Sequence, residues 1–284
     1  MKPSVSRIKL IVAKALEEDL GQGDITTESL IPPNLQGKAS ILMKSRGVLA
    51  GIYVAELTFA QVDSSLRFER LVQDGMEVEP GDRVAMVTGK AASILKAERV
   101  ALNFLQHLSG VATETAKYVS AVSGTEAKIL DTRKTTPGLR LFEKYAVKIG
   151  GGQNHRQNLA EQVLIKDNHL EALRAEGMTL GDVVRKAREN TPLTISIEVE
   201  VETVNEAKEA TAAGADIILL DNMSVAEMKR AVKAAKGYSL TEASGGIALN
   251  NVRAVAKTGV DFISIGALTH SVTALDISLE IEFG

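Results

Sequence analysis

Six short apolar segments alternate with helical patterns between residues 127 and 266, and this alternation restricts the fold more than any other feature of the sequence. The segments are residues 128–131, 163–166, 194–200, 216–221, 238–243 and 261–266. Patterns with the helical period lie between several of them, at residues 179–190, 203–213, 224–236 and 249–257. Nearly continuous apolar strands separated by helices are typical of a parallel sheet whose outer face is covered by helices.

A polar residue or a glycine stands at the carboxyl end of each of the six segments. These residues are Asp131, Lys166, Glu200, Asp221, Ser244 and Gly266. In a βα barrel the carboxyl ends of the strands meet on one face, which carries the active site. An open doubly wound sheet would spread the same residues along the edge of a crevice. Since a barrel can contain one or two strands that the pattern does not reveal, we expect an incomplete α/β barrel of seven strands or so.

The first 110 residues differ, because strands and helices do not alternate regularly there. Apolar spacing predicts helices at residues 4–20, 51–62 and 91–109. Alternation and turn residues predict strands within residues 37–50 and 66–88, with a polar, glycine-rich loop at residues 21–27. We therefore expect an α+β domain. Arg99 falls opposite the apolar face of its helix, so it is either a solvated surface residue or a side chain aimed at something outside its own domain core.

The composition argues against several classes of protein. A net charge of -3 argues against a general nucleic-acid binder, and the absence of tryptophan with only 4% aromatic residues argues against base stacking. The absence of cysteine excludes disulfides, thiolate nucleophiles and cysteine-ligated metals. No apolar run approaches the roughly 18 residues of a membrane span, and the amphipathic N-terminal segment differs from a signal peptide. We therefore expect a cytoplasmic protein with neither nucleic acid nor membrane as a partner.

One stretch, residues 131–169, reverses the acidic charge of the chain. Its cations are Arg133, Lys134, Arg140, Lys144, Lys148, Arg156 and Lys166, against four anionic residues. Pro137-Gly138 and three glycines at 150–152 interrupt it, and glycine lets a backbone approach a ligand closely. A basic, glycine-broken segment in an acidic protein indicates a pocket for a polyanionic small molecule, and a solvated basic loop is the alternative.

Arginine suits such a ligand because its planar guanidinium binds a carboxylate or a phosphate at two points. The stretch offers more cations than one phosphate requires: Arg133, Arg140, Arg156, Lys134 and His155. They suit a ligand with two carboxylates, or a dicarboxylate beside a pyrophosphate. A second reading makes Lys166 the Schiff-base lysine of a class I aldolase-like barrel. That reading explains one lysine and leaves the group of arginines unexplained.

The late strand ends indicate a phosphate site. Ser244-Gly245-Gly246 and Gly266-Ala267-Leu268-Thr269 follow the last two segments. Barrels often bind phosphate with the backbone N–H groups of these loops, where a Cβ would hold the phosphate away. A serine nucleophile has no support, because no G-x-S-x-G elbow is present.

Two carboxylates at strand ends, Glu200 and Asp221, indicate a cation site near that phosphate. They could hold Mg²⁺ directly or through water, or bind a sugar hydroxyl. The alternative is that they pair structurally with Lys166 or Arg133. Alternation places Glu198 on the same strand face as Glu200, so only nearness to the strand end favours Glu200. Histidines at zinc-type spacing are absent from the sequence.

Long collinear strings resemble the quinolinate phosphoribosyltransferase family, whose members are also called nicotinate-nucleotide pyrophosphorylases (carboxylating). The central string is DTRKTTPGLR, followed by EKYAV, GGG, NHR and IKDNH, within residues 131–169. Further strings are EEDLGQGDITT near the start, ERVALNFLQHLSGVAT at 98–113, and EVEVE, LLDN, EASGGI and IGALTHS later. They cover nearly the whole chain, with small departures such as Val111 where isoleucine is common.

The resemblance implies the fold of type II phosphoribosyltransferases. An N-terminal α/β sandwich domain would span residues 1–110 and an α/β barrel with the active site residues 111–270, and residues 271–284 would return to the first domain. The resemblance also implies a homodimer, or a hexamer built from dimers. Each site would lie between the barrel of one subunit and the N-terminal domain of its partner, with Arg99 entering the partner's site.

The same resemblance implies roles residue by residue. The residues that would line the quinolinate pocket are Arg99, Thr132, Arg133, Lys134, Arg140, His155, Arg156 and Lys166. Glu200 and Asp221 would face the ribose and the Mg²⁺ of phosphoribosyl pyrophosphate. The residues that would bind the 5′-phosphate are Ser244, Gly245, Gly246, Ile265, Gly266 and Ala267. The catalytic residues would be Lys134, Lys166, Glu200 and Asp221, and the expected cofactor is Mg²⁺.

The implied reaction converts quinolinate and phosphoribosyl pyrophosphate to nicotinate mononucleotide, pyrophosphate and CO₂ in the de novo pathway to NAD. The pyridine nitrogen is itself the nucleophile, which agrees with the absence of a cysteine and of a serine triad. One rival is a paralogue acting on another base, such as the pyrophosphorylase-like protein associated with molybdenum transport. The full TRKTTPG and NHR strings argue against it. The other rival is a catalytically silent phosphate-binding barrel, against which the intact charged strand ends argue.

Overall fold

The computed structural model describes residues 4–283 and divides into two compact units. The first unit combines the residues up to Ala116 with Thr135–Gly151 and the residues from Leu268 on. The second unit consists of Lys117–Lys134 and Gly152–Ala267, and it contains most of the predicted site. Among the helices of the described range, none is both long enough and apolar enough to pass through a bilayer.

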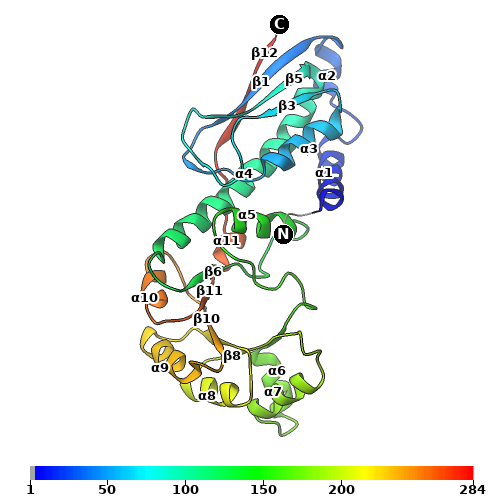
Figure 1. Ribbon diagram of the computed structural model, residues 1–284. Coiled ribbons are helices and arrows are strands. Elements are labelled where there is room, and N and C mark those ends of the chain that lie inside the picture. Colours follow the sequence, from blue (N-terminus) through cyan, green and yellow to red (C-terminus); the bar gives the residue numbers. More distant parts are fainter. Residues whose placement is uncertain (1–3, 284) are drawn as a thin grey trace. The chain divides into compact units, whose positions relative to one another are not determined.

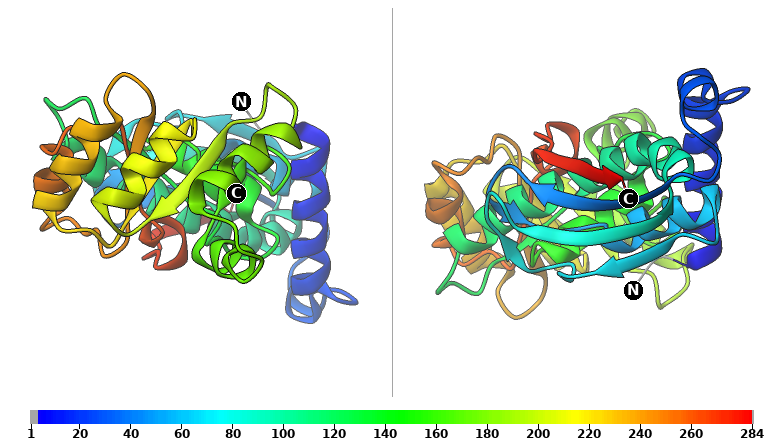
Figure 2. Two further views of the ribbon diagram at one scale, coloured as in Figure 1. Left: turned by 90° about the horizontal axis from the view of Figure 1, so that it is seen from below. Right: turned by 90° about the horizontal axis from the view of Figure 1, so that it is seen from above.

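The first unit is built on a four-stranded antiparallel sheet with the order β12-β1-β5-β3. Its strands are β1 (Gln36–Met43), β3 (Arg67–Arg70), β5 (Arg83–Lys90) and β12 (Ile277–Phe283). β12 comes from the other end of the sequence and pairs with β1, so that Gly37 lies opposite Phe283 (Figure 2). A short ribbon of β2 (Gly47–Val48) and β4 (Glu77–Val78) accompanies this sheet.

The helices of this unit are α1 (Val5–Leu20), α2 (Ile25–Leu30), α3 (Ile52–Val62), α4 (Ala91–Ala121) and α5 (Arg140–Ile149). Of these, α3 and α4 form the core with the sheet. Apolar side chains at alternate positions of β1 and β5, such as Ile41 and Val87, are fully buried in one cluster with Phe59 of α3 and Leu105 of α4. The period-two and period-3.6 patterns therefore meet in one core, and the helices expected at residues 4–20 and 51–62 are confirmed.

Two expectations for the first unit are wrong in detail. Residues 21–27 were expected to be a loop, but α2 begins at Ile25 because the Asp24 carboxylate accepts the Thr27 N–H at 2.9 Å and caps it. The helix expected at 91–109 continues to Ala121. Gly110 does not end it. A Cβ at Gly110 would lie 2.3 Å from the carbonyl oxygen of Thr273, so this glycine serves a close approach of two backbones.

The bounds of the compact units also differ from those expected for the domains, 1–110 and 111–270. α4 passes residue 110 as one helix, and residues 135–151 belong to the first unit. Within that unit the ring of Phe142 packs edge-on against Phe104, with centroids 5.3 Å apart. The Tyr145 hydroxyl donates to Asp74 at 2.6 Å, and burial together with this bond raises the pKa of Tyr145.

The second unit is built on a six-stranded parallel sheet with the order β6-β11-β10-β9-β8-β7, of which Figure 1 labels β6, β11, β10 and β8. The strands are β6 (Lys128–Leu130), β7 (Val163–Ile165), β8 (Ile197–Val201), β9 (Ile217–Asp221), β10 (Leu240–Ser244) and β11 (Phe262–Ser264). Each coincides with one of the six predicted segments. The expected parallel α/β arrangement is therefore confirmed.

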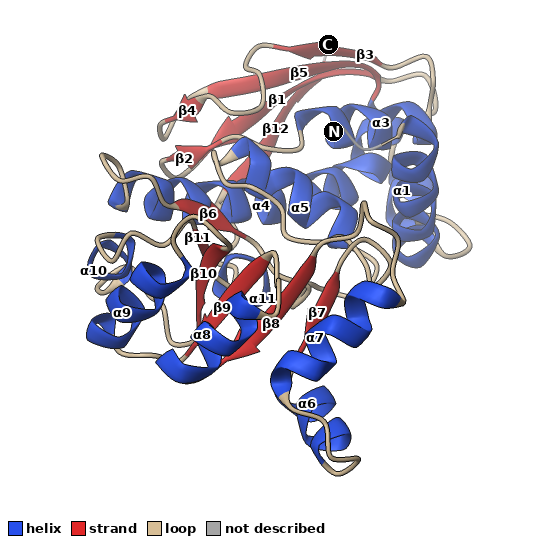
Figure 3. Cartoon of the chain, turned by 60° about the horizontal axis from the view of Figure 1, so that its bottom comes forward, coloured by secondary structure: helices blue, strands red, loops and turns tan. Residues whose placement is uncertain are grey.

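Helices between the strands cover the outer face of this sheet. They are α6 (Asp167–Arg174), α7 (Leu180–Glu189), α8 (Val204–Ala212), α9 (Val225–Ala235) and α10 (Val252–Ala256). The single turn α11 (Ala267–His270) follows β11 in the sequence and belongs mostly to the first unit. Figure 3 shows α8 and α9 lying along the same side of β8, β9 and β10. Thr203 and Ser224 begin α8 and α9, and each side chain accepts an N–H from the first turn.

The barrel is incomplete. β6 and β7 are the outer strands of the six-stranded sheet. Beside β6, Gln153 forms an isolated parallel bridge with Leu130, through hydrogen bonds of Gln153 N–H to Ile129 and of Asp131 N–H to Gln153. One residue thus occupies the place of a seventh strand. About seven strands were expected, and the described residues form six strands and this one bridge.

Candidate functional site

The predicted polar strand ends lie together at the carboxyl edge of the parallel sheet. Asp221 is the register partner of Ser244, and Glu200 is the partner of Leu219, two residues before Asp221. Because side chains alternate along a strand, Glu200 and Asp221 project from the same face of neighbouring strands. Both are partly buried. The second unit therefore brings two carboxylates and a small polar residue to one face.

Lys166 and Glu200 form an ion pair across β7 and β8. Lys166 directly precedes α6, where its backbone N–H donates to the ring of His169 at 3.0 Å. The Lys166 side chain is 46% exposed, whereas that of Glu200 is 14% exposed. A Schiff-base lysine needs a desolvated site, so this exposure and this ion pair argue against the aldolase-like reading.

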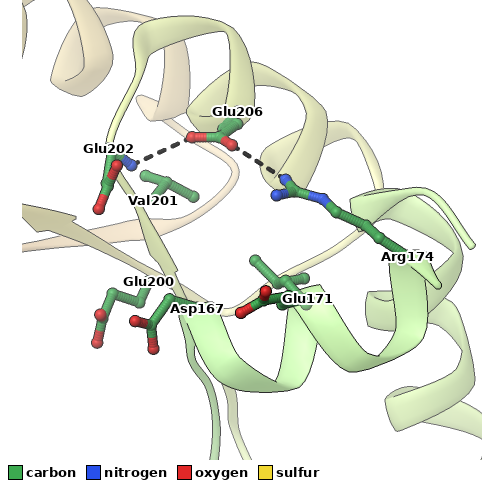
Figure 4. Close-up of a pocket in the computed structure, with 8 residues that line it drawn as sticks. Asp167, Glu171, Arg174, Glu200, Val201, Glu202 and Glu206 are labelled. Carbon is green, nitrogen blue, oxygen red and sulfur yellow. Dashed lines mark hydrogen bonds and ion pairs between the residues drawn. The ribbon is translucent and has the colours of Figure 1, made fainter.

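An acidic pocket of about 270 Å³ lies beside Glu200, between α6, the end of β8 and the start of α8 (Figure 4). Its charged lining residues are Asp167, Glu171, Arg174, Glu200, Glu202 and Glu206. Figure 4 shows that Glu206 is used structurally, since it binds the Glu202 N–H and Arg174, both at 3.2 Å. The remaining carboxylate oxygens are the ligand type that Mg²⁺ prefers.

The turn after β9 depends on a glycine in the neighbouring loop. Asn222 has a positive φ of 52°, donates its side-chain N–H to Asp221 at 2.7 Å and its backbone N–H to the Ser244 carbonyl at 3.0 Å. Gly245 has φ +86°, and a Cβ there would lie 2.2 Å from the Asn222 side-chain oxygen. Asp221 is thus oriented by Asn222, and Asn222 fits only because residue 245 is glycine.

The loops predicted to bind phosphate differ in what their backbones offer. Gly246 has φ +61°, with nothing within 4 Å of the position of a Cβ, so an anion can come close to this backbone. Ile265 is buried and donates its N–H to the Leu130 carbonyl at 3.0 Å. That amide holds β11 to β6 and is not offered to a ligand. Gly266 and Ala267 are partly buried at the end of the second unit.

The basic part of the site centres on Arg133 and Arg156, both partly buried. Arg156 donates to the Gln162 carbonyl at 2.8 Å. Burial lowers the pKa of Arg156, and the positive charge of Arg133 acts in the same direction, while Glu198 opposes both. The charge of Arg133 therefore acts on Arg156, so the two cations belong to the same part of the site. Thr132 accepts the backbone N–H of the exposed Lys134 at 3.0 Å.

His155 faces inward, toward two buried glutamates. Its Nε2 lies 3.0 Å from Glu198 and 3.7 Å from Glu242, and its Nδ1 accepts the Arg156 N–H at 2.8 Å. Because Nδ1 accepts a hydrogen bond, the proton of the neutral ring is on Nε2. The ring was expected to be a cation that holds a quinolinate carboxylate, but both of its nitrogens are engaged by protein groups.

The same three side chains resemble a metal-binding set, since one ligand atom from each of His155, Glu198 and Glu242 lies within 4.8 Å of the others. A protonated Nε2 has no lone pair for a metal. The pKa of Glu242 is raised mainly by burial and secondly by the charge of Glu198. His155 is thus hydrogen-bonded to Glu198 and lies close to Glu242, while one buried oxygen of each glutamate has no hydrogen-bond partner among the described residues.

Glu242 was not among the predicted site residues, although a signal for it exists. It stands two residues before Ser244, as Glu198 stands two residues before Glu200. Period-two alternation places such residues on the inner strand face, one layer deeper than the predicted contacts. The two remaining predicted residues belong to the first unit: Arg99 is exposed on α4, and Arg140 begins α5 and donates to Thr135 at 2.9 Å.

Two family descriptions match the chain. Residues 24–109 match the N-terminal domain of quinolinate phosphoribosyl transferase, and residues 111–280 match the C-terminal domain of the same enzyme. Together they span most of the sequence, including every predicted site residue.

Named relatives and solved structures give the same result. The chain is 44% identical to "Quinolinate phosphoribosyltransferase [decarboxylating] 2b, mitochondrial" of Nicotiana tabacum, over 97% of this chain and 82% of that protein. It is 42% identical to "Probable nicotinate-nucleotide pyrophosphorylase [carboxylating]" of Bacillus subtilis, over 97% and 93%. The crystal structure of NadC from Streptococcus pyogenes superposes with a TM-score of 0.95 at 41% identity, covering 100% of this chain and 99% of that one.

Proposed function

This chain belongs to the quinolinate phosphoribosyltransferase family and is a decarboxylating phosphoribosyltransferase of de novo NAD biosynthesis, and we propose that the carboxyl edge of its parallel sheet binds both substrates. The observation that carries the assignment of this site is the pair of partly buried cations Arg133 and Arg156, with the charge of Arg133 acting on Arg156. Two adjacent guanidinium groups repel each other in the free protein, and a dicarboxylate removes that repulsion.

We assign the quinolinate end to the basic residues around that pair. Arg133 and Arg156 bind the two carboxylates, and Lys134, which is exposed next to them, adds a third cation. Thr132 fixes the turn through the Lys134 N–H. His155 contributes indirectly, because its nitrogens already bind Glu198 and the Arg156 backbone.

We assign the phosphoribosyl end to the strand ends beside it. The backbone of Ser244, Gly245 and Gly246 binds the 5′-phosphate, aided by Gly266 and Ala267. Glu200 and Asp221 hold the ribose and Mg²⁺; their oxygens fit this ion, since the adjoining pocket is lined mainly by carboxylates. When bound, Mg²⁺ supplies positive charge that stabilises the leaving pyrophosphate. Asn222 keeps the Asp221 carboxylate in place.

The chain's own residues then mainly position the reactants. The pyridine nitrogen attacks the ribosyl carbon as pyrophosphate leaves, and the Glu200 and Asp221 carboxylates tolerate the oxocarbenium-like charge that develops. Lys166, on its long exposed side chain, exchanges its ion pair with Glu200 for the departing phosphate oxygens. Decarboxylation leaves electron density beside the pyridinium nitrogen, which the substrate itself stabilises. No enzymic nucleophile is needed.

We further propose that the active protein is a homodimer, alone or within a hexamer, that Arg99 serves the quinolinate pocket of a partner copy, and that Arg140 completes the basic lining with Lys166. Arg99 is exposed on α4 and has no place in the core of its own unit. Mixing Arg99→Ala with Lys166→Ala chains tests this: each is inactive alone, and mixed dimers regain activity because one of their two sites is intact. Mixed dimers without activity would contradict the shared site.

The assignment of the substrates to this site is tested by steady-state kinetics with quinolinate, phosphoribosyl pyrophosphate and Mg²⁺, with nicotinic acid as the parallel substrate. Product forms from quinolinate and not from nicotinic acid. Arg133→Ala raises the KM for quinolinate far more than that for phosphoribosyl pyrophosphate. Equal losses for both substrates would contradict the role of Arg133, and turnover of another base alone would favour the paralogue. The cytoplasmic location stays a prediction, which fractionation of the source cells checks.

A further inference from the structure

We propose that Glu198 and Glu242 are positioning residues, which hold the His155 ring in its neutral, Nε2-protonated form and through it hold Arg156 beside Arg133. This inference rests on the proposed function, since the task of the two arginines is defined by the carboxylates of quinolinate. Both glutamates are out of contact with solvent, with exposed fractions of 0% and 1%. They lie one layer beneath Glu200 and Ser244 on the same strand faces.

Hydrogen bonds fix both the protonation and the orientation of His155. The Arg156 N–H donates to Nδ1, so Nδ1 carries no proton. Nε2–H donates to Glu198 at 3.0 Å, and the backbone N–H of His155 donates to Asp131 at 2.8 Å. A ring held at both nitrogens and at its own backbone has one orientation. That orientation sets where the Arg156 side chain starts, two bonds from the backbone N–H that the ring binds.

The two buried glutamates carry one negative charge between them. Two carboxylates that lie this close and are this deeply buried do not both ionise. Glu198 accepts hydrogen bonds from His155 at 3.0 Å and from the Gln162 side chain at 2.9 Å, so its place beside the ring is fixed from two sides. Glu242 has one hydrogen bond, with Ser264, and faces the charges of Glu198 and Asp131. Glu242 is therefore the acid and Glu198 the carboxylate.

One buried negative charge suits the pocket in front of it. The Glu198 carboxylate attracts Arg156, which keeps the guanidinium in place while the substrate is absent. An ionised Glu242 would add a second negative charge behind the arginines and weaken their attraction for a dianion. The pair thus fixes the cations and preserves their excess charge.

The first experiment compares Glu242→Gln, Glu242→Ala and Glu198→Gln in the full-length enzyme. The amide of Glu242→Gln replaces the neutral acid in shape and hydrogen bonding, so both KM values and kcat stay within about twofold of the parent. Glu242→Ala removes the side chain that lies beside the His155 ring, and Glu198→Gln removes a charge-assisted hydrogen bond to that ring. Each variant therefore raises the KM for quinolinate roughly tenfold and leaves the KM for phosphoribosyl pyrophosphate within twofold of the parent value. The control is Asp261→Asn, which alters hydrogen bonds to Thr241 at the opposite end of the same strands and leaves both KM values unchanged.

The second experiment reads the ring directly and does not depend on activity. The chain has four histidines, so ¹⁵N-histidine labelling gives few signals. At neutral pH the His155 ring shows one protonated nitrogen, Nε2, and one unprotonated nitrogen, Nδ1. Glu198→Gln shifts both signals, and Glu242→Gln shifts them least. A doubly protonated ring, or an Nε2 signal displaced by added Zn²⁺, would overturn the proposal.

Arg156→Ala separates this inference from the proposed function. If Arg156→Ala leaves the KM for quinolinate unchanged, the assignment of the quinolinate pocket fails. If Arg156→Ala raises that KM while Glu198→Gln does not, the pocket stands and the positioning role is refuted. Equal losses in Glu242→Gln and Glu198→Gln would likewise refute the assignment of Glu242 as the acid.

Discussion

Replacing Gly245 by alanine tests how closely the turn after β9 is tied to the phosphoribosyl end of the site. The new Cβ would lie 2.2 Å from the Asn222 side-chain oxygen, while residue 245 keeps φ +86°. Gly214 offers a matched control, because it has φ +88° and nothing lies within 4 Å of its Cβ position. Both substitutions carry the same backbone strain, and only the one at Gly245 also displaces Asn222.

The magnitudes follow from these two contributions. A left-handed conformation costs an L-residue about 1–2 kcal/mol, which both variants lose. Displacing Asn222 also breaks its 2.7 Å hydrogen bond to Asp221, worth roughly 0.5–1.5 kcal/mol at a partly exposed position. With roughly 2–4 °C of Tm per kcal/mol for a chain of this size, Gly245→Ala unfolds a few degrees below Gly214→Ala.

Activity separates the variants more clearly than stability. Gly245→Ala lets the Asp221 carboxylate move, so the KM for phosphoribosyl pyrophosphate rises about tenfold, which corresponds to ~1.4 kcal/mol. The KM for quinolinate changes little. Gly214→Ala keeps both KM values of the parent enzyme. The assays are thermal unfolding and steady-state kinetics with each substrate varied in turn. Identical Tm and KM values for the two variants would refute the coupling of Gly245, Asn222 and Asp221.

Three further predictions concern pH and the cation. Burial and the charge of Glu198 raise the pKa of Glu242 to about 8. A carboxyl group whose pKa is higher in the folded than in the unfolded protein destabilises the fold increasingly as pH rises from about 4.5 to about 8. The Tm of the parent should therefore fall relative to that of Glu242→Gln across this window and equal it at lower pH. Hydrogen bonds from Ser65 and Ser93 lower the pKa of Asp63 to about 2, so the stabilisation that Asp63 provides is present above about pH 4 and is lost as pH falls toward 2. At neutral pH the Tm of Asp63→Ala should lie below that of the parent, and the two Tm values should converge in acid. A Tm difference that stays constant with pH would contradict this. EDTA should abolish turnover and added Mg²⁺ restore it, with Asp221→Asn needing more Mg²⁺ for half-maximal rate; full activity in EDTA would exclude the proposed cation site.

The parallel sheet could be predicted because its strands are short, mainly apolar segments, most of which are separated by helical patterns. That signal is local, and it located β6 to β11 without knowledge of their partners. The pairing of β12 with β1 is not local, since Gly37 and Phe283 lie at opposite ends of the sequence. Helices α5 and α6 were not predicted, because they lie in the basic stretch whose charges obscure their apolar faces.

The outer layer of the candidate site could also be predicted, because polar residues at strand ends are unusual against apolar strands. The inner layer could not. Whether His155 points to a ligand or inward depends on Glu198 and Glu242, which come from two other strands. Likewise, the N–H of Ile265 was expected to bind phosphate, yet it bonds to Leu130 of β6. A sequence motif identifies the residues of a loop, and only the tertiary structure shows which of their atoms are already used.

The position of β12 at the edge of the first sheet has a consequence for synthesis on the ribosome. β1 and β5 emerge early, but the strand that pairs with the other side of β1 is translated only after all six strands of the parallel sheet. Until then one edge of β1 presents unpaired N–H and C=O groups to other nascent chains. Lys38, in the middle of that edge strand, places a positive charge there during the wait. The sheet whose first strand is translated earliest can therefore be completed only after its last strand, β12, has been made.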